Sequence, residues 1–195
     1  FVLIMFGLTH YLLFQQSIIL ASTSILDNEK ILMQLNIEPL VFVAISFFKT
    51  ARTFLYSALL YHIINQLINP GISIRILAYP VLLFLLATLS WSFSIILASV
   101  TVFYRDLKQL IGIVLYILMY FSPVIYTADF FPDKFRELLL YNPIACLFSW
   151  LQWSMFGLTP PSIVNSIFLV LFTICSFVLA HSVYRNSRSK FTKAF

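Results

Sequence analysis

The sequence is poor in charged residues and in glycine. Asp, Glu, Lys and Arg make up 10% of its 195 residues, against about 25% in a typical soluble domain. Hydrophobic residues make up 61%, more apolar surface than a soluble fold can bury. Four glycines are present, and no segment alternates polar and apolar residues as the strands of a membrane barrel do. These shortages exclude a soluble domain and a barrel, and they predict an all-α, polytopic membrane helix bundle.

Motifs for catalysis and metal binding are also missing. The sequence has no GxxxxGK[ST] loop for the phosphates of ATP, and His10, His62 and His181 match no metal-binding spacing. Cys146 and Cys175 lie in apolar surroundings, which favours packing residues over a disulfide. The net charge of +5 comes from scattered basic residues rather than a stripe, which argues against nucleic acid. We therefore expect no enzyme and no cofactor bound by this chain.

Uncharged runs indicate where the chain can cross lipid, because a charge at the bilayer centre costs about 2.5–3.5 kcal/mol. About 20 helical residues cross the hydrocarbon core. Five crossings are predicted, at 1–26, 39–69, 76–104, 109–128 and 162–184. Because the chain begins at Phe1 inside a hydrophobic run, without an initiator Met, it reads as an N-terminally truncated fragment.

The segment 129–161 is expected to enter the membrane from one face and return. Asn142-Pro143 breaks its apolar run, and the continuous helix that remains, 144–158, is too short to span comfortably. Five crossings then place the connections 27–38 and 105–108 and the tail 185–195 on one side.

Lys and Arg are unevenly divided between the two sides. The side with the tail carries seven of them: Lys30, Arg105, Lys108, Arg185, Arg188, Lys190 and Lys193. The other side carries Arg75, Lys134 and Arg136. Because cytoplasmic loops hold an excess of basic residues, the C-terminus is expected in the cytoplasm.

Three stretches occur in a recognisable order. The first is Ser24-Ile25-Leu26-Asp27-Asn28 with Pro39, and the second is Tyr104-Arg105-Asp106-Leu107. The third is Ser122-Pro123-Val124-Ile125-Tyr126, followed by Pro132, Arg136 and Asn142-Pro143. In this order they resemble the permease subunits of type-2 ABC transporters, in particular exporters of O-antigen, capsule or teichoic-acid chains.

The resemblance implies a homodimer in the bacterial inner membrane, bound to two cytoplasmic ATP-binding subunits that hold ATP and Mg. The substrate would be a lipid-linked glycan, and membrane lipids would surround the protein. The outward gate region would contain Ser122, Pro123, Pro132, Arg136, Asn142 and Pro143. The connection 27–38 would press into the ATPase through Asp27, Asn28, Glu29 and Lys30, although an ordinary solvated connection is the alternative. The family's first cytoplasmic connection is usually more basic than this one.

Lys49 and Arg52 share one face of a helix that begins near Pro39. They lie about 15–20 Å along it, where they can line a cavity and attract the phosphate of a lipid-linked glycan. Alternatively, both cations reach back to the cytoplasmic rim, which leaves a short span behind them.

Tyr116 and Tyr120 lie mid-span, where aromatic belts at the membrane surface do not explain them. Together with Phe121 and Tyr126 they can present rings and hydroxyls to a passing sugar chain. Packed tyrosines bonded to a neighbouring helix are the alternative. Arg105 and Asp106 are expected to form a local cap or ion pair.

The same fold also supports other functions. Export of a drug or a small lipid-like molecule is the first alternative. A membrane enzyme that acts on polyprenol-linked sugars is a distant one, because Asp129, Asp133 and Glu137 form no evident metal or base constellation.

Overall fold

The computed structural model describes residues 1–35, 37–68 and 74–194. These residues form helices and no strand, so the predicted all-α membrane bundle is confirmed. The α-helices are α1 (Val2–Asp27), α2 (Glu29–Gln34), α3 (Leu40–Ile68), α4 (Tyr79–Thr101), α5 (Leu107–Tyr120), α6 (Asp133–Leu140), α7 (Pro143–Phe156) and α8 (Ile163–Ala194). Two 3₁₀ turns, η1 (Ile74–Ala78) and η2 (Ala128–Phe130), precede α4 and α6.

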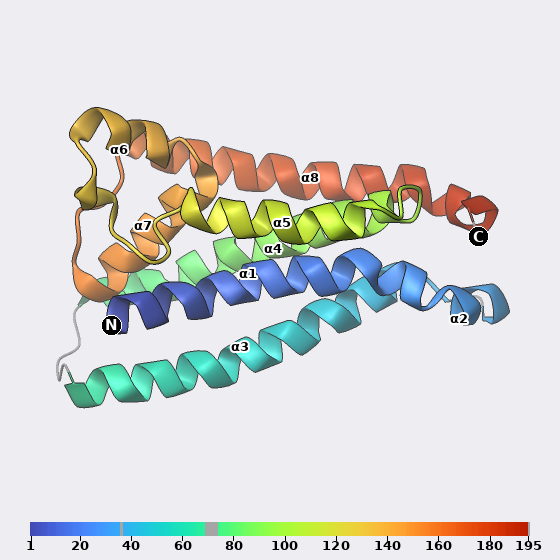
Figure 1. Cartoon of the computed structure of the whole chain (residues 1–195), viewed down its shortest axis with the longest axis horizontal. Coiled ribbons are helices and arrows are strands. Elements are labelled where there is room, and N and C mark those ends of the chain that lie inside the picture. The colour runs from blue at the N-terminus through green and yellow to red at the C-terminus, as the bar shows by residue number, and fades with distance from the viewer. Residues whose placement is uncertain (36, 69–73, 195) are drawn as a thin grey trace.

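Four segments of the described chain are long and apolar enough to cross a membrane. They are Val2–Asp27, Leu40–Leu67, Ile74–Thr101 and Ile163–Arg188, and they run lengthwise through the molecule (Figure 1). α8 continues as a helix to Ala194, so it includes most of the segment 185–195 that we expected as a cytoplasmic tail. The side chain of Lys193 lies outside the described residues.

The predicted crossing at 109–128 is not matched by a helix of spanning length. α5 has 14 residues, which is about 21 Å of helix. It ends at Tyr120, and turns follow. Proline lacks a backbone N–H and disfavours a helical residue before it, so Pro123 prevents the helix from continuing. The helix in this segment is therefore shorter than the predicted crossing, which was drawn from the absence of charge and took no account of this proline. That the segment crosses the membrane stays a prediction.

α1 occupies the centre of the bundle and packs against α3, α4, α5 and α7. Its side chains Phe6, Tyr11 and Ile18 are fully buried. The outer face of α3 is apolar as well, since Leu55 and Leu59 are 62% and 61% exposed. An exposed apolar face of this kind is suited to lipid.

The elements separate into two ends of the molecule (Figure 1). One, called here the α2 end, contains α2, the connection between α4 and α5, and the end of α8. The α7 end contains the start of α1, α6 and the connection that leads into α8. Ion pairs join the segments of the α2 end: Arg105 lies 3.8 Å from Glu29, and Arg188 lies 3.2 Å from Glu38.

Candidate functional site

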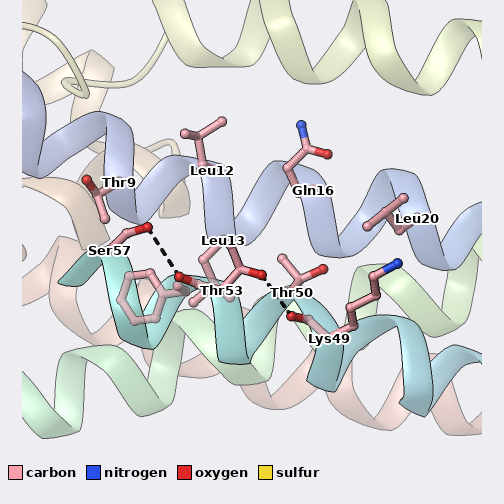
Figure 2. A pocket seen from close by; sticks show the side chains of 10 residues that line it. Thr9, Leu12, Leu13, Gln16, Leu20, Lys49, Thr50, Thr53 and Ser57 are labelled. Carbon is pink, nitrogen blue, oxygen red and sulfur yellow. Dashed lines mark hydrogen bonds between the residues drawn. The ribbon is translucent and has the colours of Figure 1, made fainter. Parts of the chain in front are cut away.

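A groove of about 400 Å³ lies between α1 and α3, and Figure 2 shows the side chains that line it. We call it the α1–α3 groove. α1 contributes Thr9, Leu12, Leu13, Gln16 and Leu20, and α3 contributes Lys49, Thr50, Thr53, Phe54 and Ser57. The groove is therefore partly polar, with one cation.

Lys49 is exposed and extends from α3 toward Leu20 of α1 (Figure 2). The hydroxyls of Thr53 and Ser57 continue this side of the groove, and each donates a hydrogen bond to the carbonyl four residues earlier, at 3.2 Å. Their oxygen lone pairs therefore remain able to accept hydrogen bonds from a ligand. Arg52 is exposed but does not line the groove, so only one of the two predicted cations lies in this cavity.

The predicted aromatic residues gather where α5 ends. The hydroxyls of Tyr116 and Tyr120 lie 3.0 Å apart, and their rings meet edge to face at 5.4 Å. Tyr126 donates to the carbonyl of Tyr120 at 2.9 Å. Tyr116 and Tyr120 are 54% and 50% exposed, so they are not tyrosines packed in the interior of this chain.

A second cavity of about 370 Å³ adjoins these residues, and we call it the tyrosine pocket. It is lined by Tyr120, Phe121, Tyr126, Phe131, Phe135, Leu138, Leu139 and Asn142. Aromatic faces and a few hydroxyl and amide groups form its wall, a combination suited to sugar rings, which present both apolar faces and hydroxyls.

Asn142-Pro143 begins α7 and ties it to the end of α5. The side chain of Asn142 accepts a hydrogen bond from the N–H of Ile144 at 3.0 Å, which caps the helix. Its amide also donates to the carbonyl of Phe121 at 3.2 Å and to the hydroxyl of Ser122 at 3.3 Å. Pro143 occupies the first turn, where its missing N–H costs nothing.

Gln152 was not predicted from the sequence, yet it holds the turn after α5 in place. It is 2% exposed, and its amide donates to the carbonyls of Pro123 at 2.7 Å and Tyr126 at 2.9 Å. The available signal was an uncharged polar side chain in an apolar helix, which often marks a functional contact.

Gly7 also escaped prediction and brings α1 against the same turn. A Cβ atom on Gly7 would lie 1.7 Å from the carbonyl oxygen of Val124, so only glycine permits this approach. Nearby, the hydroxyl of Tyr11 donates to the carbonyl of Leu115. α1 is thus in direct contact with both α5 and the turn that follows it.

Arg136 of α6 links the segment before α6 to the segment after α7. Its guanidinium lies 3.1 Å from Asp129 and donates to the hydroxyl of Thr159, which in turn donates to Asp129. Pro132 is the residue before α6. The side chains of Asp133 and Glu137 lie outside the described residues. In the described part of the chain, no group of three His, Cys, Asp or Glu could hold a metal ion.

The predicted coupling residues lie where α1 ends and α2 begins: Asp27 is the last residue of α1, Asn28 forms the turn, and Glu29 and Lys30 begin α2. Thr23 donates to Asp27 at 2.6 Å, and Asn28 donates to the carbonyl of Ser24 at 2.7 Å. Lys30 is exposed.

We expected Arg105 to pair with its neighbour Asp106, but its guanidinium forms an ion pair with Glu29 of α2. Helix packing brings the connection between α4 and α5 next to α2, so Arg105 meets a carboxylate that is far from it in the sequence. α2 and the residue after it also expose apolar side chains: Ile31, Met33 and Leu35 are 41%, 59% and 53% exposed. A short helix with this surface is suited to docking on another protein.

Comparison with known proteins gives a consistent picture. A family model described as "ABC-2 type transporter" matches residues 1–156. A protein of Klebsiella pneumoniae described as "O-antigen export system permease protein RfbA" is 29% identical over 91 residues, which cover 46% of this chain and 33% of the relative. Another of the same description and organism is 34% identical over 65 residues, or 33% of this chain and 25% of the relative. The matches thus span a third or less of the relatives' own length.

Proposed function

Because the chain belongs to the ABC-2 type transporter family, we propose that it is the permease subunit of an ATP-driven exporter of lipid-linked polysaccharide across the bacterial inner membrane. The observation that carries the proposal is the similarity to two O-antigen export permeases. The exposed tyrosines at the end of α5 support a glycan substrate.

The working unit proposed is two copies of this chain with two cytoplasmic ATP-binding subunits. ATP hydrolysis takes place in those subunits, which hold ATP and Mg. The α2 end faces the cytoplasm, where the exposed Ile31, Met33 and Lys30 contact the ATPase. The pair between Glu29 and Arg105 then connects α2 to the start of α5, so that a push on α2 reaches the helix that carries the tyrosines.

The path proposed for the substrate has two parts. Lys49 in the α1–α3 groove attracts the phosphate of the lipid anchor, because a cation inside a membrane protein is favourable only with a partner or with water. The tyrosine pocket then accepts the sugar chain at the α7 end. Hydrogen bonds from Asn142 and Gln152 hold the turn between these parts.

Separate substitutions of the two cations test this path. Lys49→Leu should lower glycan export strongly, whereas Arg52→Leu should lower it less, because only Lys49 lines the groove. Lys49→Arg should retain most export, since it keeps the positive charge. Export is measured as surface glycan in cells whose membranes contain equal amounts of each variant. Normal export by a fully inserted Lys49→Leu variant would support the alternative, in which both cations only anchor α3 at the membrane surface.

The coupling role is tested by reversing the charges of Glu29 and Lys30. We expect the complex to retain ATP hydrolysis while export falls. A contact as small as α2 can pass the movement of the ATPase to the permease, but it does not by itself hold the subunits together. Normal export by this variant, combined with loss of export when 105–108 is changed, would show that coupling belongs to the connection 105–108 and not to α2.

A further inference from the structure

A third groove lies on a different part of the bundle, between the first half of α3, α4 and α8. It consists of two adjoining hollows of about 490 and 460 Å³, which share Phe47 and Trp91. We call it the α4–α8 groove. Among the described residues, it shares no lining side chain with the α1–α3 groove or the tyrosine pocket, so it is separate from both parts of the proposed substrate path.

The hollow of about 490 Å³ is suited to a hydrocarbon chain. Its walls are apolar, and its two hydroxyls, from Thr88 and Thr173, each donate to a backbone carbonyl of their own helix at 2.8 Å. Of its described lining residues, none is charged. Phe84 and Ile174 at its rim are 71% and 55% exposed, so the hollow is open to the surface of the bundle.

The other hollow leads to a pair of opposite charges at the α2 end. Glu38 lines it, and its carboxylate lies 3.2 Å from the guanidinium of Arg188 and accepts a hydrogen bond from Tyr184 at 3.1 Å. The side chains of Glu38 and Arg188 are 42% and 58% exposed. The mouth of the groove therefore presents one carboxylate and one guanidinium side by side.

The length of the groove matches one lipid leaflet. Leu40 to Phe47 covers about 10 Å of α3, and Phe84 to Trp91 covers about 10 Å of α4. Added end to end, these two stretches make the groove about 20 Å long. Half of a bilayer's hydrocarbon core is roughly 15 Å thick, so the rest of the groove reaches the level of the headgroups. The groove thus runs from the charged pair at the membrane surface toward the middle of the bilayer.

We propose that the α4–α8 groove binds a phospholipid with a primary-amine headgroup, of the phosphatidylethanolamine class. An acyl chain lies against Phe47 and Trp91, the phosphate meets Arg188, and the ammonium meets Glu38. The zwitterionic headgroup complements both charges at the mouth, which a purely anionic headgroup does not. Such a lipid would join α3 to α8, which the Glu38–Arg188 pair already links.

Fluorescence of Trp91 tests the proposal directly. The sequence has three tryptophans, Trp91, Trp150 and Trp153. The signal of Trp91 is taken as the difference between a Trp150→Phe/Trp153→Phe variant and the same variant with Trp91→Phe added, because any other tryptophan of the complex contributes equally to both. Each variant, in complex with its ATPase subunits, is placed in phosphatidylcholine nanodiscs that contain a minor fraction of lipid with brominated acyl chains. We expect brominated phosphatidylethanolamine to quench Trp91 about two- to fivefold more effectively than brominated phosphatidylcholine, the preference that exposed ion pairs provide.

Two further variants separate the headgroup from the acyl chain. Glu38→Gln/Arg188→Gln should remove the preference and leave the general quenching. Ala87→Phe, which fills the hollow of about 490 Å³, should reduce quenching by both lipids. Equal quenching by the two lipids before these changes, or stronger quenching by brominated phosphatidylglycerol, would overturn the proposal.

Native mass spectrometry provides a second measurement that needs no tryptophan substitution. The unmodified complex should retain one phosphatidylethanolamine per permease chain, and the Glu38→Gln/Arg188→Gln variant should lose it. A Thr88→Cys variant that cross-links efficiently to a second copy would show that protein, not lipid, fills the groove, and this would also overturn the proposal.

Discussion

A methyl group added at Gly7 should destabilise the protein at the contact between α1 and the turn after α5. The Cβ of Gly7→Ala would lie 1.7 Å from the carbonyl oxygen of Val124 and 2.7 Å from its carbonyl carbon. An ordinary contact needs at least 3.4 Å, so the two backbones must separate by about 1.7 Å. Val124 is fully buried, and the carbonyls on either side of it, of Pro123 and Tyr126, are bonded to Gln152.

The cost can be estimated from these constraints. Extra methylenes in packed interiors cost about 1–3 kcal/mol, and we expect the upper part of this range because backbone rather than a flexible side chain has to move. Alanine in place of a helical glycine returns about 1 kcal/mol. A net loss of about 2 kcal/mol remains, which is a roughly 30-fold increase in the unfolded fraction.

Gly112→Ala is the matched control, because a Cβ at Gly112 of α5 would meet nothing within 4 Å. It should be neutral or up to about 1 kcal/mol stabilising. Both variants and the unmodified protein are unfolded with SDS in mixed micelles, and the free energies are compared. If Gly7→Ala is as stable as Gly112→Ala, the close approach of α1 to Val124 is refuted.

Three further predictions concern the region around α7. Gln152→Leu should cost about 1–3 kcal/mol in the same unfolding assay, because it leaves two buried carbonyls without partners; an unchanged free energy would mean that water replaces the amide. Gly157→Ala should also destabilise, since Gly157 has a φ of 70° and its Cβ would lie 2.1 Å from the guanidinium of Arg75. Adding Arg75→Ala should restore only the part of the loss due to the clash, and full restoration would show that the backbone angle is unimportant. In a cysteine-free background, single cysteines at Lys134 and Ser162 should react with an impermeant reagent from the same face of intact cells, and labelling from opposite faces would rule out a re-entrant segment.

Local signals in the sequence were sufficient for the class of fold. Scarce charge and long apolar runs predicted membrane helices, because lipid requires every backbone polar group to be bonded within its own helix. The helix start at Asn142-Pro143 was also visible as a break, since proline cannot continue a helix and asparagine caps one. The helix in the segment 109–128 was expected to be longer than α5 is, although the sequence contains Pro123. An absence of charge does not ensure that a run is helical throughout.

Only the tertiary structure decided which of these elements meet. Lys49 and Arg52 are three residues apart, yet only Lys49 lines a groove, because the rotation of α3 against α1 is set by packing along the whole helix. Arg105 pairs with Glu29 rather than with its neighbour Asp106 for the same reason. Periodicity and charge describe one helix at a time, and they contain no information on how two helices are turned toward each other. The amino-acid sequence by itself thus determined that this chain is a membrane helix bundle. The packing of the helices determined where its grooves, pockets and ion pairs lie.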